Sequence, residues 1–240
     1  MIKAIFFDLD GTLLPLNERK FAKIYFKTLY KKVKFLKISK MNFFKALYKG
    51  ALAQVKNDGT RTNEEVFWES IKNTLGVDLS IYKDVLNEYY NTSYLKTKRA
   101  TKPCSESKKI VEFCRENGLK TILSTNPIFP RLAVLNRMNF VNLKEEDFDY
   151  ITNYSNSTCC KPNSLYFKKL LETLNLKAEE VILFGNNEIE DAKCAREVGI
   201  KCYLIDRCLI SQNKKKDITY PIIKIEEVIP TIKKEISRND

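Results

Sequence analysis

The stretch AIFFDLDGTLLP, residues 4–15, decides how the rest of this sequence is interpreted. An apolar run that is typical of a buried strand ends at Asp8, and Asp10 follows after only Leu9. Carboxylates at the end of a buried strand are costly to bury unless something pairs with them. Because residues two apart in an extended chain point to the same side, Asp8 and Asp10 can act on one bound group.

The composition excludes several classes of protein and several kinds of chemistry. With 240 residues, 44% of them hydrophobic, the chain suits one large domain or one domain with an insertion, so global disorder is excluded. No apolar run reaches the roughly 18 residues that cross a membrane. The seven Cys, an odd number without a regular framework, are typical of reduced thiols, so we expect a cytoplasmic protein. Because the chain contains no His, catalysis by histidine and zinc binding by histidine are excluded.

The pattern of apolar residues changes character along the chain. Residues 17–97 follow a helical pattern, and breaks near Ser39, at 57–60 and at 75–80 divide it into four predicted helices. After Pro103 helices and strands alternate, and the charged stretch NKKKD, residues 213–217, is predicted to be a loop. The predicted strands are 2–8, 119–125, 148–152, 180–185, 200–206 and 220–223, and the later helices are 107–117, 128–138, 163–174, 188–198 and 225–236.

This alternation predicts an α/β fold. Strands rich in Ile, Val, Leu and Phe that alternate with helices indicate a parallel sheet covered by helices on both faces. The all-helical block lies between the first strand and the others, so it is interpreted as an insertion that caps the sheet. The predicted domains are a core of residues 1–16 and 98–240 and a helical cap of residues 17–97.

Polar side chains follow four of the predicted strands at the point where each strand ends. In open parallel sheets, ligands bind beyond the carboxyl ends of the strands. We therefore expect these side chains to meet at one edge of the sheet. The four segments are Asp8-Leu9-Asp10-Gly11-Thr12, Ser124-Thr125-Asn126, Cys160-Lys161-Pro162 and Gly185-Asn186-Asn187-Glu188-Ile189-Glu190-Asp191.

The residue types at this edge indicate phosphoryl transfer. Two neighbouring carboxylates repel each other unless a cation intervenes, and Mg²⁺ prefers oxygen ligands. One carboxylate can then attack phosphorus, while the other protonates the leaving oxygen and later deprotonates the attacking water. Thr125 and Lys161 would bind the non-bridging phosphate oxygens, and Gly11 permits the tight turn after the strand. Each residue alone also fits a structural role in a loop or at the surface, but the combination favours catalysis.

These motifs resemble those of the haloacid dehalogenase-like superfamily of phosphohydrolases. The matching stretches are FFDLDGT, TILSTN, CKP and LFGNNEIEDA. The resemblance implies a Rossmannoid core and an aspartyl-phosphate on Asp8, with Asp10 as the general acid and base and its backbone carbonyl on Mg²⁺. It also implies that the helical block is the cap of the phosphoglycolate phosphatase and β-phosphoglucomutase branch, which closes over the substrate.

One position departs from the family pattern. The family usually has Gly-Asp-x-x-x-x-Asp in the last motif, and its first Asp commonly binds the metal, but this chain has Gly185-Asn186. An amide oxygen can still bind Mg²⁺, yet a full negative charge is missing, and a unit charge pair at about 4 Å is worth roughly 4 kcal/mol at an effective dielectric of 20. We therefore expect weakened Mg²⁺ binding by Asp8, Asp10, Asn186 and Asp191, with Asp191 or its neighbour Glu190 compensating in part.

Further candidates for substrate contact lie at the strand ends and in two polar stretches. The stretch 54–70 is hypothesised to be a specificity loop of the cap, although Thr62 and Glu65 in it also match a capping box at a helix N-terminus. The stretch 126–133 holds an arginine that either reaches an anionic substrate or faces outward from a helix. The substrate-binding candidates are Gly11, Thr12, Asn126, Arg131, Lys56, Asn57 and Arg61, with Asn63 beside them.

Asp10 also distinguishes between reactions within the family. A halide leaving group needs no proton, whereas the alkoxide of a phosphate ester does, so an acid here favours a phosphatase or phosphomutase over a dehalogenase. We predict a Mg²⁺-dependent hydrolase that cleaves a phosphate monoester of a small metabolite. A phosphomutase and, in view of Asn186, a catalytically weakened binding or regulatory protein are the alternatives.

The charge distribution is relevant to which binding partners we expect for this protein. The formal net charge is +12, and residues 17–60 hold 12 Lys and Arg against 2 Asp and Glu. A stripe of lysines on the first predicted helix can bind nucleic acid or an anionic membrane, or steer anionic substrates, but a solvated face is the favoured interpretation. We expect a small phosphorylated metabolite as the partner, no nucleic acid or membrane, and a monomer or a dimer. The stripe consists of Lys20, Lys23, Lys27, Lys31 and Lys34.

Overall fold

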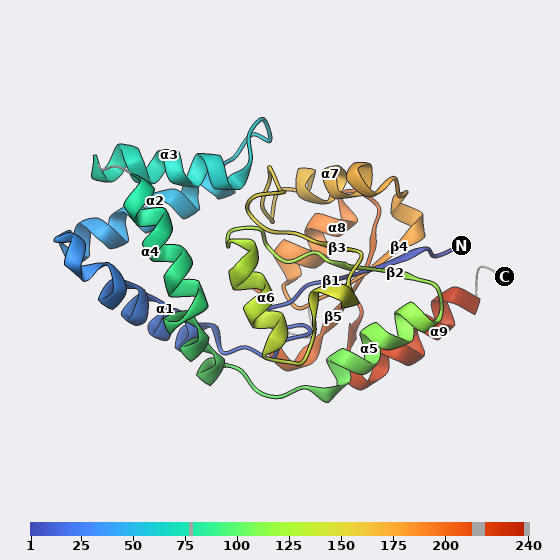
Figure 1. Ribbon diagram of the computed structural model, residues 1–240. Coiled ribbons are helices and arrows are strands. Elements are labelled where there is room, and N and C mark those ends of the chain that lie inside the picture. Colours follow the sequence, from blue (N-terminus) through green and yellow to red (C-terminus); the bar gives the residue numbers. More distant parts are fainter. Residues whose placement is uncertain (77–78, 213–218, 238–240) are drawn as a thin grey trace.

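The computed structural model describes residues 1–76, 79–212 and 219–237. It has two lobes, one built on a β-sheet and one made of helices (Figure 1). The predicted loop 213–217 lies outside the described residues.

Six strands form one parallel sheet in the order β3-β2-β1-β4-β5-β6, which confirms the predicted α/β fold class. β1 lies between β2 and β4, and all four of its side chains are fully buried. Phe7 of β1 lies beside Leu123 of β2 and Phe184 of β4, so the segments that follow these strands begin at the same edge. The strands are β1 (Ala4–Phe7), β2 (Lys120–Leu123), β3 (Tyr150–Ile151), β4 (Val181–Gly185), β5 (Lys201–Ile205) and β6 (Ile222–Ile223).

Helices cover both faces of the sheet, because successive side chains of a strand point to opposite sides (Figure 1). Ile5 and Phe7 pack with α5, α6 and α9 on one face, and Ala4 and Phe6 pack with α7 and α8 on the other. The elements of this lobe are α5 (Ser105–Glu116), α6 (Arg131–Asn139), η3 (Glu145–Asp147), α7 (Leu165–Leu174), η4 (Ala178–Glu180), α8 (Cys194–Arg196), η6 (Asp206–Cys208), η8 (Ile225–Glu227) and α9 (Val228–Ser237).

The segment after β4 differs from the predicted helix 188–198. It begins as a π-helical turn, η5 (Glu188–Lys193), and only then continues as α8. The side-chain oxygen of Asn187 accepts hydrogen bonds from the backbone N–H groups two and three residues ahead. Such side-chain bonds compete with the regular α-helical pattern, and π turns are frequent at functional sites.

The helical lobe contains the four helices predicted between residues 17 and 97. Thr62 and Glu65 form the predicted capping box at the start of α3, and Gly76 ends this helix with a left-handed backbone (φ +62°). The elements are α1 (Glu18–Val33), η1 (Lys34–Leu36), α2 (Lys40–Val55), α3 (Asn63–Leu75), α4 (Leu79–Asn91) and η2 (Ser93–Ala100).

Two segments join the lobes and lie side by side. Leu16 forms an antiparallel bridge with Thr101, and the backbone N–H of Asn17 donates to the carbonyl of Ala100 at 2.9 Å. The chain therefore leaves the sheet lobe and returns to it at one place. The predicted boundary at residue 97 falls inside η2.

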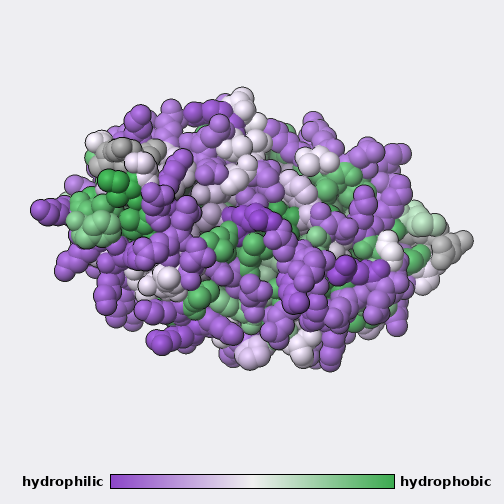
Figure 2. Space-filling view, in the orientation of Figure 1, coloured by the Kyte–Doolittle hydropathy of each residue, from purple (hydrophilic) through white to green (hydrophobic). Residues whose placement is uncertain are grey.

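The surface is largely hydrophilic on the side of the molecule shown in Figure 2. The five lysines of the predicted stripe are exposed, four of them on α1 and Lys34 in η1, while Leu29 and Val33 of α1 are buried. All seven cysteines are free thiols. Within the described ranges, no helix combines the length and the apolar character that a membrane crossing requires.

Candidate active site

Lys161 lies between two carboxylates at the edge where the central strands end. Its Nζ is 3.0 Å from Asp8 Oδ1 and 2.6 Å from Asp191 Oδ1, and the three side chains are at most 10% exposed. Burial alone lowers the pKa of the Lys161 ammonium, but the charges of Asp191 and Asp8 outweigh burial and hold the pKa well above its ordinary value. The lysine therefore stays charged and lies within ion-pair distance of both carboxylates.

Asp8 follows β1 directly and is the centre of this cluster. The hydroxyl of Thr12 donates to its Oδ2 at 3.4 Å, while Lys161 holds Oδ1. Burial raises the pKa of Asp8 to about 8; Lys161 opposes this rise, and the negative charges of Asp191 and Asp10 add to it. A further cation beside Asp8 would lower the pKa again, because it favours the ionised form.

Without a divalent cation, the free energy of unfolding should decrease as the pH rises from about 4 to about 8. The pKa of Asp8 is about 8 in the folded chain against an ordinary value of 3.8, so in this window the folded state keeps a proton that the unfolded state has released. The contribution of Asp8 to the slope of the free energy of unfolding against pH approaches about 1.4 kcal/mol per pH unit. Urea denaturation in EDTA measures it, with Asp8→Asn as the control. The free energy of unfolding of Asp8→Asn should exceed that of the wild type by an amount that grows with pH and shrinks when Mg²⁺ is added. A difference in free energy of unfolding that does not depend on pH would contradict the prediction.

Asp10 contacts a residue that the sequence interpretation missed. Arg137 of α6 is completely buried, and its Nε lies 3.1 Å from Asp10 Oδ1. Its Nη1 donates to the hydroxyl of Tyr94 at 2.6 Å, and its guanidinium lies over the ring of Phe129 at 4.6 Å. Burial raises the pKa of Asp10, and the charges of Arg137 and Lys161 oppose that rise.

A signal for Arg137 exists in the sequence. In α6 the buried positions are Ala133, Val134, Arg137 and Met138, which is the spacing of an amphipathic helix with one basic residue on its apolar face. A buried arginine without an anion is costly, so a partner carboxylate is expected. The sequence does not tell which of the many carboxylates that partner is.

Asn186 presents its amide oxygen to the cluster. Asn186 Oδ1 lies 3.3 Å from the Thr12 hydroxyl and shares its single proton with Asp8 Oδ2. Asn186 Nδ2 donates to the carbonyl of Cys208 at 2.7 Å, which fixes the orientation of the amide. Asp191 Oδ2 accepts from the backbone N–H groups of Asn186 and Asn187, both at 3.0 Å. Both oxygens of Asp191 thus have partners within the protein.

Gly11 is required for this close approach. It has a φ of +93°, which favours glycine, and a Cβ at this position would lie 2.2 Å from Asn186 Nδ2. The turn after β1 can therefore pack directly against the end of β4.

Thr125 and Asn126 lie at the same edge. The backbone N–H of Ser124 donates to the carbonyl of Phe7 at 2.8 Å, so the two residues that follow run beside the end of β1. Thr125 is buried, and Asn126 Nδ2 donates to the carbonyl of Lys161 at 3.2 Å and to Glu190 Oε2 at 3.0 Å. The four strand ends singled out in the sequence thus meet in one place.

The remaining substrate-binding candidates have other partners. Arg61 pairs with Glu69, and the Asn57 side chain donates to the carbonyl of Arg61 at 2.8 Å, so both lie within the turn before α3. With Lys56 they line a separate polar depression. Arg131 pairs with Glu145 and lines another depression. None of these four residues is in contact with the Asp8 cluster.

Asn63, from the same polar stretch, does connect the lobes. Its Nδ2 lies within hydrogen-bond distance of the carbonyls of Pro127 and Cys159, both at 3.2 Å, and of Cys160 Sγ at 3.3 Å. The start of α3 is therefore anchored directly beside Lys161.

The oxygen donors at this edge fit a hard divalent cation. The described part of the chain has no cluster of three or more His, Cys, Asp or Glu arranged to hold a metal. The donors here are instead Asp8 Oδ2 and Asn186 Oδ1, which lie on either side of the Thr12 hydroxyl. Oxygen-only donors suit Mg²⁺, although Asn186 supplies less negative charge than an Asp would. The cation would in turn favour the ionised form of Asp8.

Comparisons with known proteins show what this chain is similar to. A model of the haloacid dehalogenase-like hydrolase family matches residues 2–199. A HAD phosphatase structure from Thermococcus onnurineus is 19% identical, covers 96% of this chain and 98% of its own, and has a TM-score of 0.60. A 2-haloacid dehalogenase from Pseudomonas syringae pv. Tomato DC3000 is 13% identical, covers 100% of both chains, and has a TM-score of 0.64.

A third solved structure contains ligands. It is a HAD family enzyme from Bacteroides thetaiotaomicron in complex with magnesium and inorganic phosphate, 18% identical, covering 91% of this chain and 100% of its own, with a TM-score of 0.54. At these identities the likeness shows a shared fold. No curated protein sequence matches this chain.

Proposed function

The chain belongs to the haloacid dehalogenase-like hydrolase family, and from this premise we propose that it is a Mg²⁺-dependent phosphatase acting on a phosphate monoester of a small metabolite. One observation carries the proposal: a buried lysine holds one oxygen of Asp8, and the Thr12 hydroxyl holds the other next to the Asn186 amide. This arrangement orients a carboxylate at the mouth of the sheet for attack on an electrophile.

The proposed reaction has two steps. Asp8 attacks phosphorus to form an acyl phosphate, and the bond to the ester oxygen breaks while Asp10 donates a proton to that oxygen. Asp10 then removes a proton from water, which attacks the phosphorus, releases inorganic phosphate and regenerates Asp8. Lys161 and Thr125 bind the non-bridging oxygens and offset their charge.

The metal would be held by Asp8, the backbone carbonyl of Asp10 and Asn186. When bound, Mg²⁺ offsets the negative charges of Asp8 and of the phosphoryl group. We assign Asp191 to holding Lys161 and the backbone of Asn186 rather than to direct contact with the ion, because both of its oxygens already have partners. Glu190 would act as a further negative charge that lies more distant from the metal and does not contact it.

The helical lobe is proposed to act as a cap. Gly11, Thr12 and Asn126 are proposed to contact the phosphate, and the anchoring of Asn63 beside Lys161 would couple the position of the cap to the phosphate site. The Asp10 side chain is 27% exposed and the Asp8 side chain is 10% exposed, so both carboxylates retain some access to solvent.

Hydrolysis of p-nitrophenyl phosphate tests the proposed function. The purified chain should release p-nitrophenol and inorganic phosphate in the presence of Mg²⁺. Transfer of the phosphoryl group to a second organic molecule without release of phosphate would instead indicate the phosphomutase. Binding of phosphorylated metabolites without turnover of any of them would indicate the non-catalytic protein.

Asn186→Asp should tighten Mg²⁺ binding, because it adds a negative charge beside Asp8. The gain is limited, since the new carboxylate would face the Cys208 carbonyl, to which the amide now donates. We expect the Mg²⁺ concentration for half-maximal turnover to fall by about tenfold, or about 1.4 kcal/mol. Mg²⁺ titration of turnover and calorimetry in the absence of substrate measure the effect. Asn187→Asp, one residue further along, is the matched control, and an unchanged affinity in Asn186→Asp would count against its role as a ligand.

A further inference from the structure

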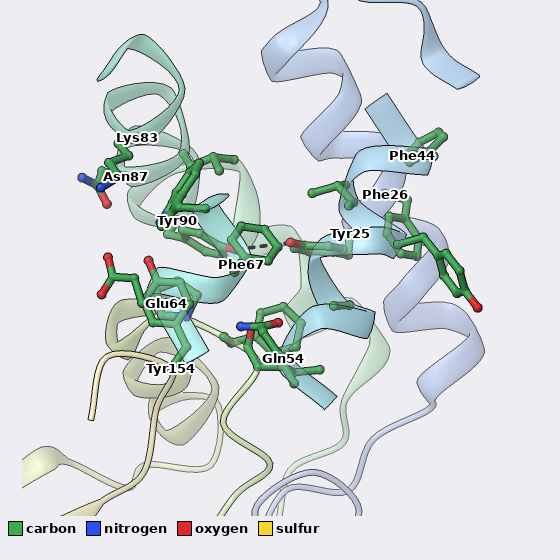
Figure 3. A pocket seen from close by; sticks show the side chains of 18 residues that line it. Tyr25, Phe26, Phe44, Gln54, Glu64, Phe67, Lys83, Asn87, Tyr90 and Tyr154 are labelled. Atoms are coloured by element: carbon green, nitrogen blue, oxygen red, sulfur yellow. Dashed lines mark hydrogen bonds between the residues drawn. The ribbon is translucent and has the colours of Figure 1, made fainter. Parts of the chain in front are cut away.

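A cavity of about 510 Å³ lies between the helical lobe and the segment after β2 (Figure 3). This volume is within the range of about 300–1,000 Å³ that is usual for small-molecule sites. Helices α1 to α4 supply most of its wall, and residues 128–130 and Tyr154 of the sheet lobe supply the rest. Its aromatic lining includes Tyr25, Phe44, Phe67, Tyr90, Phe129 and Tyr154.

The cavity is close to the catalytic carboxylates. Phe129 lines it, and the guanidinium of Arg137 lies 4.6 Å from the centre of the Phe129 ring. Arg137 in turn contacts Asp10 at 3.1 Å. The lining segment 128–130 begins two residues after Asn126, whose side chain donates to the carbonyl of Lys161. The guanidinium of Arg137 therefore lies between Phe129, which is part of the cavity wall, and Asp10.

Most of the residues that line the cavity are aromatic or aliphatic, and three of the polar ones already have partners within the protein. The hydroxyls of Tyr25 and Tyr90 contact each other at 3.2 Å, as Figure 3 shows, and Gln54 donates to the carbonyl of Ile128 at 3.3 Å. Burial raises the pKa of Tyr25 and of Tyr90, so both stay neutral.

The charges of the lining cancel. Among the described residues that line the cavity, Glu64 is the one anion and Lys83 is the one cation. They lie on the same side of it, together with Asn87 (Figure 3). A second phosphate would find no excess of positive charge here. The hydroxyls of a sugar would lie mostly against apolar and aromatic side chains, which makes their burial costly.

We propose that this cavity binds the apolar organic group of the substrate, so that the substrate is the monophosphate of a hydrophobic alcohol rather than a sugar phosphate. The proposal rests on the proposed phosphatase function. The phosphate would occupy the Asp8 site and the alkyl or aryl group would extend past Phe129 into the aromatic cavity. Burial of its apolar surface would supply the binding energy, as in other largely apolar ligand sites.

Two chain-length series test the proposal. For ethyl, butyl, hexyl and octyl phosphate, kcat/KM should rise by about fourfold for each methylene group until the cavity is filled. The same dependence should appear in the affinity of the matching alkylphosphonates, which are not hydrolysed, measured by calorimetry on the wild-type protein with Mg²⁺. Glucose 6-phosphate should be a poorer substrate than hexyl phosphate.

Two alanines of α2 provide a matched pair of variants. Ala51 lines the cavity, whereas Ala53 lines the polar depression on another side of the same helix. Ala51→Phe should reduce the preference for octyl over ethyl phosphonate at least tenfold, because the new ring occupies the space of the alkyl group. Ala53→Phe should keep the wild-type preference. Thermal unfolding of both variants shows whether each is folded.

The outcomes separate this proposal from the proposed function. Affinities for the phosphonates that do not depend on chain length in the wild-type protein would overturn the cavity proposal, whatever the variants do. Chain-length dependence that Ala51→Phe leaves intact would overturn it as well. Length-dependent binding without hydrolysis of any ester would retain the cavity as the site of an apolar group and refute the phosphatase.

Discussion

Asp8→Asn should lower the turnover of p-nitrophenyl phosphate by roughly 10⁴-fold or more, because the amide cannot form the acyl phosphate. Lys161 and Thr12 would still hold a side chain of the same shape at this position. Release of p-nitrophenol at saturating Mg²⁺ measures the loss. Retention of more than about a tenth of the wild-type turnover would refute Asp8 as the nucleophile.

The loss of turnover in Asp8→Asn should result from the missing nucleophile and not from unfolding of the chain. Burial works against the ionised form of Asp8, so the neutral amide should leave the melting temperature at pH 7 unchanged or higher. Asp84→Asn is the matched control, because it makes the same substitution at an exposed position of α4 and should retain full activity. A lowered melting temperature in Asp8→Asn would mean that Asp8 stabilises the fold and would weaken the catalytic interpretation.

Arg137→Met should lower the free energy of unfolding by about 3 kcal/mol, because it leaves a partly buried Asp10 without its cation. The expected loss is at the lower end of the range for broken buried pairs, since the Asp10 side chain is 27% exposed. The substitution also removes the donor to Tyr94 and the cation over Phe129. Urea denaturation monitored by Trp fluorescence measures the effect, and an unchanged stability would mean that the contact contributes nothing.

The same variant should change which substrates are hydrolysed. Arg137 opposes the rise in the pKa of Asp10 and holds its side chain in place, so we expect it to position this acid. An alkoxide needs the proton of Asp10 far more than p-nitrophenolate does. The ratio of turnover for octyl phosphate to turnover for p-nitrophenyl phosphate should therefore fall by at least about tenfold. Arg137→Lys keeps the charge and should recover part of the ratio, whereas equal losses for both substrates would indicate a structural role alone.

The convergence of the four strand ends was predictable from local patterns. A buried apolar run identifies β1, the alternation of helices and strands indicates parallel order, and parallel order brings the carboxyl ends of neighbouring strands to one edge. These rules bring the segments that follow the strands to one edge, whereas the distances of 3.0 and 2.6 Å from Lys161 to Asp8 and Asp191 depend on how the loops after β3 and β4 fold. The catalytic roles of these residues remain predictions.

Which charged residues pair with each other was not predictable from local patterns in this way. Arg61, Arg131 and Arg137 are all basic residues near polar stretches, yet the first two pair with Glu69 and Glu145, and the third is buried against Asp10. Which of them is buried depends on how α6 packs against the helical lobe. Local polar patterns therefore favour Arg61 and Arg131 as substrate ligands, whereas the burial of Arg137 against Asp10 follows from tertiary packing.

Local patterns in the chain are sufficient to predict the order of the elements, the parallel sheet and the residues at its edge, because backbone periodicity and strand direction depend on neighbouring residues. Tertiary packing sets the orientation of the Asn186 amide, the burial of Arg137 and the apolar cavity between the lobes. Each of these depends on contacts between segments far apart in the chain: Asn186 with Thr12 and Cys208, Arg137 with Asp10 and Tyr94, and Phe129 with α1. Packing selects one such set among many that the same pattern of polar and apolar residues allows.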